Sequence, residues 1–406
     1  MTVFRAGRRG ALRSWERVIG SFVVDRNVGL AAAAMFLLAL GENLWRRFIP
    51  RYLDALGAPA SAIGLYGSTQ DLLDGLYQYP GGWVADRFGR RAALLACVAT
   101  ATLGYAVYLV APTWPVAFLG LVLVAAWSSM ASPTLFAVVG DALPKGRRTI
   151  GFTVQAILQR IPVAIAPTLG GLAIAAYGLQ DGIRLGLAVT VALGVGTLGL
   201  VAMVRVSQPA AAGSINALAV WRSLSRPLRR LLVSDILIRA CEGMAGVFVV
   251  LYATRIVGVT TPQFGLLVAV EMATAMAIYL PAAAFADRLG RKPFVVATFM
   301  AFALFPIAVS VARSFAGLVG AFVVAGLREV GEPARKALIV DLGDSRIRGR
   351  TVGLYYLVRC LAISPAAFLG GFLWSRSPAA PFLAAGVLGL AGTLTFALSR
   401  EGTDAT

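Results

Sequence analysis

Twelve long runs of apolar residues, separated by short polar segments, are the feature that most constrains what this sequence can fold into. They lie at about 28–53, 61–84, 92–111, 116–140, 151–177, 183–204, 229–254, 263–286, 293–312, 315–340, 351–374 and 379–398. A helix that crosses the hydrocarbon core of a bilayer needs about 20 mostly apolar residues, and each run is close to that length or longer. Charged residues make up only 14% of the chain, against roughly 25% in soluble domains. The sequence therefore predicts an all-α integral membrane protein with twelve transmembrane helices, and a soluble enzyme is not expected.

Basic residues give the chain a formal net charge of +18, from 37 Lys and Arg residues against 19 Asp and Glu residues. They lie in short clusters between alternate pairs of apolar runs, so we do not expect nucleic-acid binding. The clusters are the N-terminal arm, Arg87/Arg90/Arg91, Lys145/Arg147/Arg148, Arg222/Arg226/Arg229/Arg230, Arg288/Arg291/Lys292 and Arg346/Arg348/Arg350. Because short loops rich in Lys and Arg stay in the cytoplasm, we predict a multi-pass protein of the cell membrane with both termini cytoplasmic. Lipids are its expected surroundings and a monomer its expected state.

An internal repeat divides the chain into two halves. Residues 85–91 (ADRFGRR) match residues 286–292 (ADRLGRK) at an offset of 201, and Gly170-Gly171 matches Gly370-Gly371 at an offset of 200. An offset that stays at 200–201 over most of the chain indicates a duplicated six-helix unit with pseudo-symmetry between its copies. We predict a basic N-terminal arm (1–27), an N-terminal six-helix bundle (28–204), a cytoplasmic linker (205–228), a C-terminal six-helix bundle (229–398) and a cytoplasmic tail (399–406).

The loop between the second and third runs resembles the signature of a known transporter family. Residues 82–91 (GWVADRFGRR) match the G-x-x-x-D-R-x-G-R-R loop of the major facilitator superfamily (MFS), and the second copy differs at Ala283, which replaces the first glycine. Residues 166–171 (APTLGG) resemble the family's antiporter-associated GPxxGG motif in helix five. The family's R-x-x-Q-G motif in helix four is absent, because residues 128–133 (SSMASP) contain no arginine. The resemblance implies the MFS fold, alternating access, and a cavity lined by helices one, four, seven and ten.

The resemblance also implies a gate on the cytoplasmic side. Asp86 would face the N-terminus of helix eleven, where the partial positive charge favours an anion, and Asp287 would face the start of helix five by symmetry. The predicted gating residues are Asp86, Arg87, Gly89, Arg90, Arg91, Asp141, Asp287, Arg288, Arg291, Lys292, Asp341 and Arg350. The alternative is that the arginines only anchor the topology.

Twelve charged residues lie near the centres of apolar runs, where each would cost about 2.5–3.5 kcal/mol on insertion scales. They must therefore face protein or a wet cavity. Helical spacing favours pairing of Glu42 with Arg46, of Arg239 with Glu242, and of Glu332 with both Arg328 and Arg335. The predicted substrate-binding residues are Glu42, Arg46, Arg239, Glu242, Arg328 and Glu329. For each of them a structural ion pair is the alternative.

Asp71 and Asp74 form the first candidate for a proton-carrying site. They are three residues apart on one helix face, and a buried pair of like charges tends to retain one proton. Glu42 is the third candidate. The alternative is a static brace in which the aspartates pair with Arg46 or Arg47.

These features together predict a secondary active transporter rather than an enzyme. The chain has no histidine and no Walker A loop, and we expect no cofactor or metal. The expected activity is proton-coupled efflux of drug-like or amphipathic small molecules. The alternatives are proton-coupled import of a polar metabolite such as a sugar, and a transporter-like receptor without flux.

Overall fold

The computed structural model of the chain describes residues 26–88, 90–125, 127, 148–204, 225–342 and 348–399. Nearly all of these residues are helical, and no strand occurs among them. The predicted all-α class is thereby confirmed. Most of the predicted N-terminal arm and linker, nearly all of the tail, Gly89 and Asp141 lie outside the described residues.

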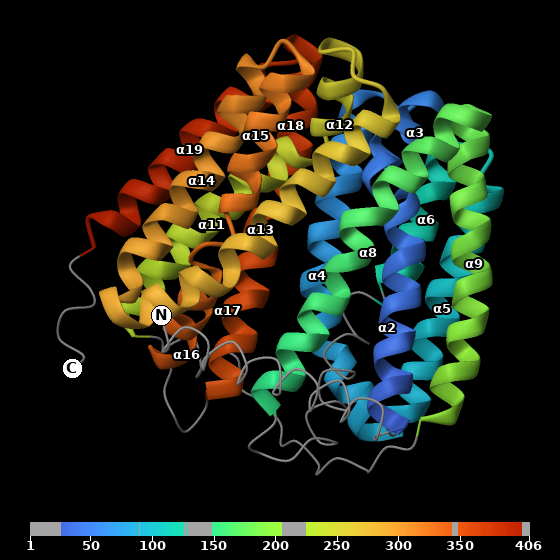
Figure 1. Cartoon of the computed structure of the whole chain (residues 1–406), viewed down its shortest axis with the longest axis horizontal. Coiled ribbons are helices and arrows are strands. Elements are labelled where there is room, and N and C mark those ends of the chain that lie inside the picture. The colour runs from blue at the N-terminus through green and yellow to red at the C-terminus, as the bar shows by residue number, and fades with distance from the viewer. Residues whose placement is uncertain are drawn as a thin grey trace, which may run out of the picture.

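Two groups of helices follow one another along the chain and lie side by side (Figure 1). The N-terminal group, blue to green, contains α2 (Arg26–Trp45), η1 (Arg46–Phe48), α3 (Ile49–Ala55), α4 (Ala60–Phe88), α5 (Arg90–Val110), α6 (Trp114–Ala125), α8 (Arg148–Tyr177) and α9 (Leu179–Met203). The C-terminal group, yellow to red, contains α11 (Arg226–Gly246), α12 (Val249–Leu251), η4 (Tyr252–Ile256), α13 (Thr261–Leu289), α14 (Arg291–Val311), α15 (Phe315–Leu327), α16 (Glu332–Asp341), α17 (Arg348–Ile363), α18 (Pro365–Arg376) and α19 (Ala380–Ala397). In this view the groups meet at the top and diverge toward the bottom.

All twelve predicted apolar runs contain helix, and eight described segments are long and apolar enough to cross a membrane. These eight are 91–110, 160–177, 179–203, 226–256, 261–279, 291–311, 353–376 and 380–397. The other four runs are the first, second, fourth and tenth. The first is interrupted by the 3₁₀ turn η1, the second carries Asp71 and Asp74, the fourth passes beyond the described residues, and the tenth is divided between α15 and α16.

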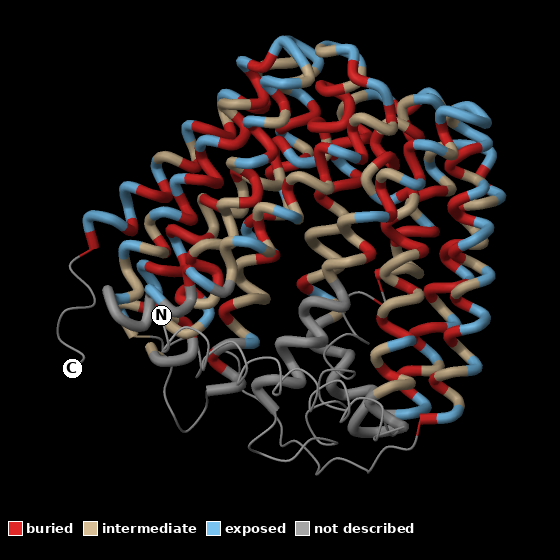
Figure 2. Tube along the Cα trace, viewed as in Figure 1, coloured by how far each residue is buried: buried red, intermediate tan, exposed pale blue. Residues whose placement is uncertain are grey.

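The outer faces of the helices are apolar, as a lipid-facing surface requires. Leu103, Val195 and Val387 are each more than half exposed, although they are large and hydrophobic. Buried residues run through the interior of each group and through the region where the groups meet (Figure 2). Exposed apolar side chains on helices of this length and composition are typical of a surface that faces lipid.

We use the name seam for the contacts between the two groups, where α4 lies against α17 and α18 and α8 lies against α13. Glycines make very close backbone contacts near its upper end. A Cβ atom on Gly64 would lie 2.4 Å from the Ala367 carbonyl oxygen, and one on Gly265 would lie 2.4 Å from the Thr168 Cα. Gly64 and Gly265 are repeat equivalents at an offset of 201. The seam therefore follows the pseudo-symmetry that the sequence repeat indicates.

Gly64→Ala should push the groups apart at the upper end of the seam. The new methyl group would meet the backbone of α18, which cannot rotate away as a side chain can, and overpacking of this kind costs about 1–3 kcal/mol. Distances between spin labels at the exposed residues Ala55 and Ser377 should shift to longer values. Gly196→Ala is the control, since nothing lies within 4 Å of its Cβ position. Equal distance distributions in both variants would contradict this reading of the seam.

Candidate functional site

A break in the tenth apolar run places charged residues at mid-height in the C-terminal group. Pro333 lies in the first turn of α16, where it cannot donate the backbone hydrogen bond of a continuous helix. The amides of Arg328 and Glu329 instead make short turns to Ala325 and Gly326. The Gly331 N–H donates to the Thr298 hydroxyl at 2.6 Å. Irregular backbone at membrane depth is tolerated where it is buried in protein or lines a cavity.

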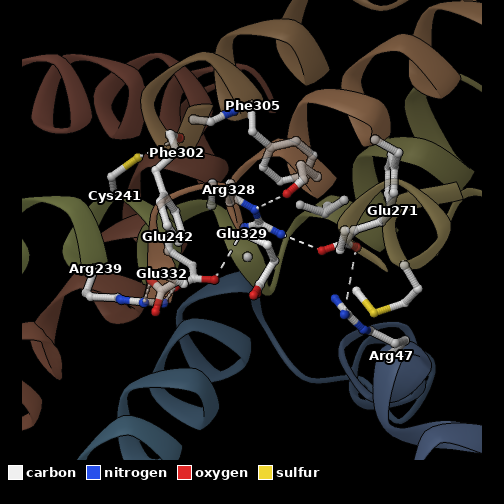
Figure 3. A pocket seen from close by; sticks show the side chains of 18 of the residues that line it. Arg47, Arg239, Cys241, Glu242, Glu271, Phe302, Phe305, Arg328, Glu329 and Glu332 are labelled. Carbon is white, nitrogen blue, oxygen red and sulfur yellow. Dashed lines mark hydrogen bonds and ion pairs between the residues drawn. The ribbon is translucent and has the colours of Figure 1, made fainter. Parts of the chain in front are cut away.

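A cavity of about 370 Å³ lies beside this break (Figure 3). Most of its wall belongs to the C-terminal group, with contributions from α11, α12, α13, α14, α15 and α16. The N-terminal group contributes Arg47 and Arg160. The charged lining residues are Arg47, Arg160, Arg239, Arg328 and Lys336, together with Glu242, Glu271, Glu329 and Glu332. Five cations against four anions leave the cavity almost neutral.

An alternating series of ion pairs crosses the cavity (Figure 3). Arg239 donates to Glu242 at 2.8 Å, and Arg328 donates to Glu242 at 3.3 Å and to Glu271 at 2.5 Å. Arg47 lies 3.8 Å from the other oxygen of Glu271. The Phe302 ring lies beneath the guanidinium groups of both Arg239 and Arg328, at 4.8 and 5.1 Å from its centroid. The cavity charges are thus fixed by one another and by an aromatic floor.

Two ion pairs join the helix groups across the cavity. Arg160 of α8 donates to Glu329 at 2.7 Å, and Arg47 approaches Glu271 of α13. The side chains of Arg47 and Glu329 are 40% and 32% exposed, so water reaches both pairs. In each pair the cation comes from the N-terminal group and the anion from the C-terminal group. The two walls therefore present opposite charges to the space between them.

A second charge cluster, centred on a fully buried aspartate, lies next to the cavity in the C-terminal group. Asp235 of α11 is 0% exposed, and its Oδ2 accepts from Arg335 at 2.9 Å, from Tyr355 at 3.1 Å and from Arg359 at 3.3 Å. Arg335 also donates to both oxygens of Glu332, and Glu332 accepts from Arg239 at 2.7 Å. We call these six residues the Asp235 cluster. Arg239 and Glu332 belong to both the cluster and the cavity wall, so the two are continuous.

Glu42 lies in a sealed environment in the N-terminal group. It is 6% exposed, and the Tyr105 hydroxyl donates to it at 2.5 Å. Its repeat equivalent Glu242 has a side chain that is 37% exposed to the cavity. The equivalent of Tyr105 at an offset of 200 is Phe305, which has no hydroxyl and lines the cavity. The Tyr105 hydroxyl group is therefore one of the differences between the surroundings of two symmetric glutamates.

Asp71 and Asp74 lie on α4 toward the seam rather than in the cavity wall. The Asp71 Oδ2 is close to α11, because a Cβ on Gly243 would lie 3.2 Å from it. Charged groups from both halves act on Asp71: Asp74 on its own helix, Glu242 and Arg239 on α11, and Arg359 on α17. Asp74 in turn interacts electrostatically with Arg46. Both aspartates are partly exposed.

Of the six predicted substrate-binding residues, four line the cavity, namely Arg239, Glu242, Arg328 and Glu329. Glu42 and Arg46 are not among its lining residues, and the neighbouring Arg47 is. The sequence reasoning missed Arg47, Glu271 and Asp235 as site residues. Asp235 precedes Arg239 by one helical turn, and that spacing is a signal that could have identified it. Of the helices that the resemblance placed around the cavity, the described part of the fourth run contributes nothing.

The side chains of most predicted gating residues are not among those that the structure describes: Asp86, Arg87, Arg90, Asp287, Arg288, Asp341 and Arg350. Three loop cations are described, namely Arg91, Arg291 and Lys292. Arg91 donates to the Ala202 carbonyl in the last turn of α9, and Lys292 donates to the Ser399 carbonyl just after α19. Cations are favourable at such helix C-terminal ends. In this structure Arg91 and Lys292 therefore bind within their own helix group.

No group of three or more potential metal ligands occurs in the part of the chain that the structure describes. The apolar helices, the close seam and a charged cavity that both helix groups line define a membrane transport protein. A family model described as Major Facilitator Superfamily matches residues 31–252 and 231–405. The chain therefore belongs to the major facilitator superfamily, which confirms the resemblance seen in its signature loop.

Three proteins similar to this chain have low sequence identity to it. An uncharacterized MFS-type transporter of Methanocaldococcus jannaschii is 20% identical over 379 residues, which cover 90% of this chain and 93% of the relative. The nucleoside transporter NupG has a similar fold, with a TM-score of 0.77, 13% identity and coverage of 93% of this chain and 100% of that one. A POT family transporter in complex with 5-aminolevulinic acid has a TM-score of 0.75, 14% identity and coverage of 90% and 94%. These similarities establish the fold.

Proposed function

We propose that the chain is a proton-coupled secondary transporter whose cavity binds a small amphipathic compound that carries both a positive and a negative charge. The observation that carries the proposal is the division of charge across the cavity. Arg47 and Arg160 of the N-terminal group face Glu271 and Glu329 of the C-terminal group. A bridging ligand would place its anionic end on the arginines and its cationic end on the glutamates. No buried charge would then be left uncompensated, which is the costly outcome in such sites.

The size and the apolar wall of the cavity support an amphipathic ligand. A volume of about 370 Å³ lies in the range of about 300–1,000 Å³ that is usual for small-molecule sites. Phe264, Phe302, Phe305 and Phe322 all contribute to the wall. Their rings offer flat apolar surface to the body of a ligand whose ends are charged.

Efflux remains our proposal for the direction of transport. It is supported by the APTLGG segment of α8, in which Gly170 packs against the Leu44 backbone and Gly171 against Thr261 across the seam. The alternative is import of a polar metabolite. It is favoured by the structural neighbour in complex with 5-aminolevulinic acid, a compound with an amino group and a carboxyl group. An uncharged sugar is less well supported, because it would not replace either cross-cavity ion pair.

The positions of three acids support proton coupling. Two of them lie close to the seam, and the third is buried inside the N-terminal group. Asp71 and Asp74 lie where α4 meets the C-terminal group. Glu42 is buried against Tyr105. None of the three is among the lining residues of the cavity, so a proton carried there would not compete directly with substrate.

Ligand binding and flux test the proposal in sequence. A thermal-shift screen of purified protein with zwitterionic, amphipathic and uncharged compounds would identify a ligand. Counterflow of that ligand in proteoliposomes, and its accumulation under an imposed pH gradient, would then test transport and coupling. Binding without counterflow would indicate a receptor, and counterflow without gradient-driven accumulation would indicate a uniporter. A preference for uncharged compounds would contradict the proposed substrate class.

Glu242→Gln and Glu42→Gln should have different effects although the residues are repeat equivalents. Glu242 reaches the cavity, so its neutralisation should weaken binding of the ligand found in the screen by at least about tenfold. Glu42 is sealed against Tyr105, so its neutralisation should leave affinity nearly unchanged and lower the melting temperature, at a cost of about 1–3 kcal/mol. Affinity and melting temperature should be measured on each variant. Equal loss of affinity in both would place Glu42 in the site after all.

A further inference from the structure

The seam is very narrow beside the candidate proton site. A Cβ on Gly75 of α4 would lie 2.6 Å from the Cβ of Cys360 on α17. Gly75 directly follows Asp74, and Cys360 directly follows Arg359. This close contact of α4 and α17 thus lies beside an acid of the N-terminal group and an arginine of the C-terminal group.

Arg359 is only partly satisfied by its own helix group. One terminal nitrogen donates to Asp235 at 3.3 Å, and the guanidinium lies 4.5 Å from the centroid of the Tyr356 ring. Its side chain is 14% exposed, and its Nε is buried without a hydrogen-bond partner. A buried donor without an acceptor is costly. A second arrangement of the side chain in which this donor finds an acceptor would therefore be favourable.

Asp71 offers such an arrangement from across the seam. The charged groups that act on it are Asp74 from α4, Glu242 and Arg239 from α11, and Arg359 from α17. The two acids among them disfavour the carboxylate form of Asp71, and the two arginines favour it. Arg239 is already held by Glu242 at 2.8 Å and by Glu332 at 2.7 Å. Arg359 is therefore the cation that is freer to move toward Asp71.

We propose that Arg359 is a positioning residue for coupling, which pairs with Asp235 in its own helix group when Asp71 is protonated and with Asp71 across the seam when Asp71 has lost its proton. The step needs no further reactant. The proton leaves the Asp71 carboxyl group to water, and the resulting carboxylate attracts the guanidinium. The new ion pair holds α4 against α17. Protonation of Asp71 removes that attraction and allows the helices to separate. The switch itself does not depend on the proposed function. Only its role in the transport cycle rests on proton-coupled transport.

The Asp235 cluster can release Arg359 without exposing an uncompensated charge. Asp235 keeps its hydrogen bonds from Arg335 at 2.9 Å and from Tyr355 at 3.1 Å. The Oδ1 of Asp235 and the Nε of Arg239 are both buried without hydrogen-bond partners, and they lie 3.9 Å apart. When Arg359 leaves Oδ2, Arg239 can close the short gap to Oδ1 and donate a hydrogen bond there.

Movement of Arg239 would carry the signal into the cavity. Arg239 holds Glu242, which lines the cavity, and a shift toward Asp235 would weaken that bond. Glu242 would then be freer to bind the cationic end of a substrate. The charge of Asp71 on α4 is in this way linked to the substrate site through Arg359, Asp235 and Arg239, each of which contacts the next. Such a link is coupling only if one part of the protein has two arrangements and both sites shift the balance between them. In this proposal that part is the seam, in which α4 and α17 are either held together or separated.

The test measures the seam directly, in purified protein without substrate. Spin labels introduced as unnatural amino acids at the exposed residues Ala92 of α5 and Phe285 of α13 leave the three native cysteines untouched. Acidification of the wild type should protonate Asp71 and let the helices separate. The ratio of short to long distances should therefore fall by about tenfold, a typical size for coupled equilibria. Arg359→Gln and Asp71→Asn should each abolish this pH response, and the double variant should add nothing further. Arg376→Gln, at an exposed arginine at the end of α18, is the matched control and should keep the response.

Several results would overturn the proposal. Among them are a wild type without pH response, a normal response in Arg359→Gln, and a normal response in Asp71→Asn. Arg359→Lys keeps the charge and should retain part of the response, which separates loss of the switch from misfolding when melting temperatures are compared. Flux is measured separately in proteoliposomes. A seam that responds to pH in a protein without proton-driven flux would refute the proposed function and leave the switch intact. Proton-driven flux in Arg359→Gln that is coupled as in the wild type would refute the switch alone.

Discussion

Asp71→Asn is expected to abolish uphill accumulation of substrate and to leave substrate exchange in place. Accumulation requires net movement of a proton with each cycle, and an amide cannot take up and release that proton. Exchange requires only that the loaded carrier changes its orientation. Because an asparagine side chain resembles a protonated aspartate in shape and charge, the variant should bind substrate nearly as well as the wild type. The measurement is gradient-driven accumulation and counterflow on the same proteoliposome preparation.

The comparison of three acids decides where the proton is carried. Asp71 lies next to the seam and to arginines of the other helix group, Asp74 interacts with Arg46 inside its own group, and Glu42 is sealed against Tyr105. We therefore expect Asp71→Asn to have the largest effect. Asp181→Asn, at an exposed acid in the first turn of α9, is the control and should accumulate substrate as the wild type does. If Asp71→Asn, Asp74→Asn and Glu42→Gln all retain accumulation, coupling runs through acids of the C-terminal group or does not occur.

The sequence carried most of the information on the fold because lipid imposes a simple rule on it. Each spanning segment must be long and apolar, so the twelve runs locate the helices without knowledge of any contact. The repeat then predicts which positions are equivalent, and the seam glycines Gly64 and Gly265 follow it. Local pairs were also within reach, since Arg239 with Glu242 and Glu332 with Arg335 need only helical spacing.

The contacts across the cavity could not be predicted in the same way. Arg160 and Glu329 are 169 residues apart, and no local pattern links them. The prediction that Arg328 pairs with Glu332 assumed a continuous helix. The break before Pro333 turns Arg328 toward Glu242 and Glu271 instead. At the adjacent arginines of the first run, the 3₁₀ turn η1 places Arg47 in the cavity wall, whereas Arg46 interacts with Glu42 and Asp74.

Symmetry in the sequence also concealed a functional difference. Glu42 and Glu242 are equivalent in position, which predicts equivalent roles. Their surroundings differ because Tyr105 supplies a hydroxyl group to Glu42, whereas Phe305 supplies none to Glu242. A repeat therefore predicts where two groups lie more reliably than what they do.

Asp235→Asn is expected to be the most destabilising single substitution in the C-terminal group. The substitution keeps the shape of the side chain and removes the carboxylate that faces Arg335, Arg359 and Tyr355 in a site with no exposure to solvent. Loss of one partner of a buried ion pair costs about 3–5 kcal/mol, because the remaining charge stays desolvated. The melting temperature and the free energy of unfolding in mild detergent should both fall. The control is again Asp181→Asn, which should change the free energy of unfolding by less than about 0.5 kcal/mol.

The effect should be asymmetric within the Asp235 cluster, and this asymmetry distinguishes a specific network from general loss of packing. Arg335→Gln leaves Asp235 with Arg359 and Tyr355, and it leaves Glu332 with Arg239 at 2.7 Å. Each acid keeps a donor, so the loss should be smaller than in Asp235→Asn. Arg359→Gln added to Asp235→Asn should recover part of the stability, because it removes a cation whose ion pair is already gone. In a double-mutant cycle this recovery appears as a coupling energy of about 0.5–3 kcal/mol. Strictly additive effects would show that Asp235 and Arg359 stabilise the fold independently, and the cluster would then not act as one unit.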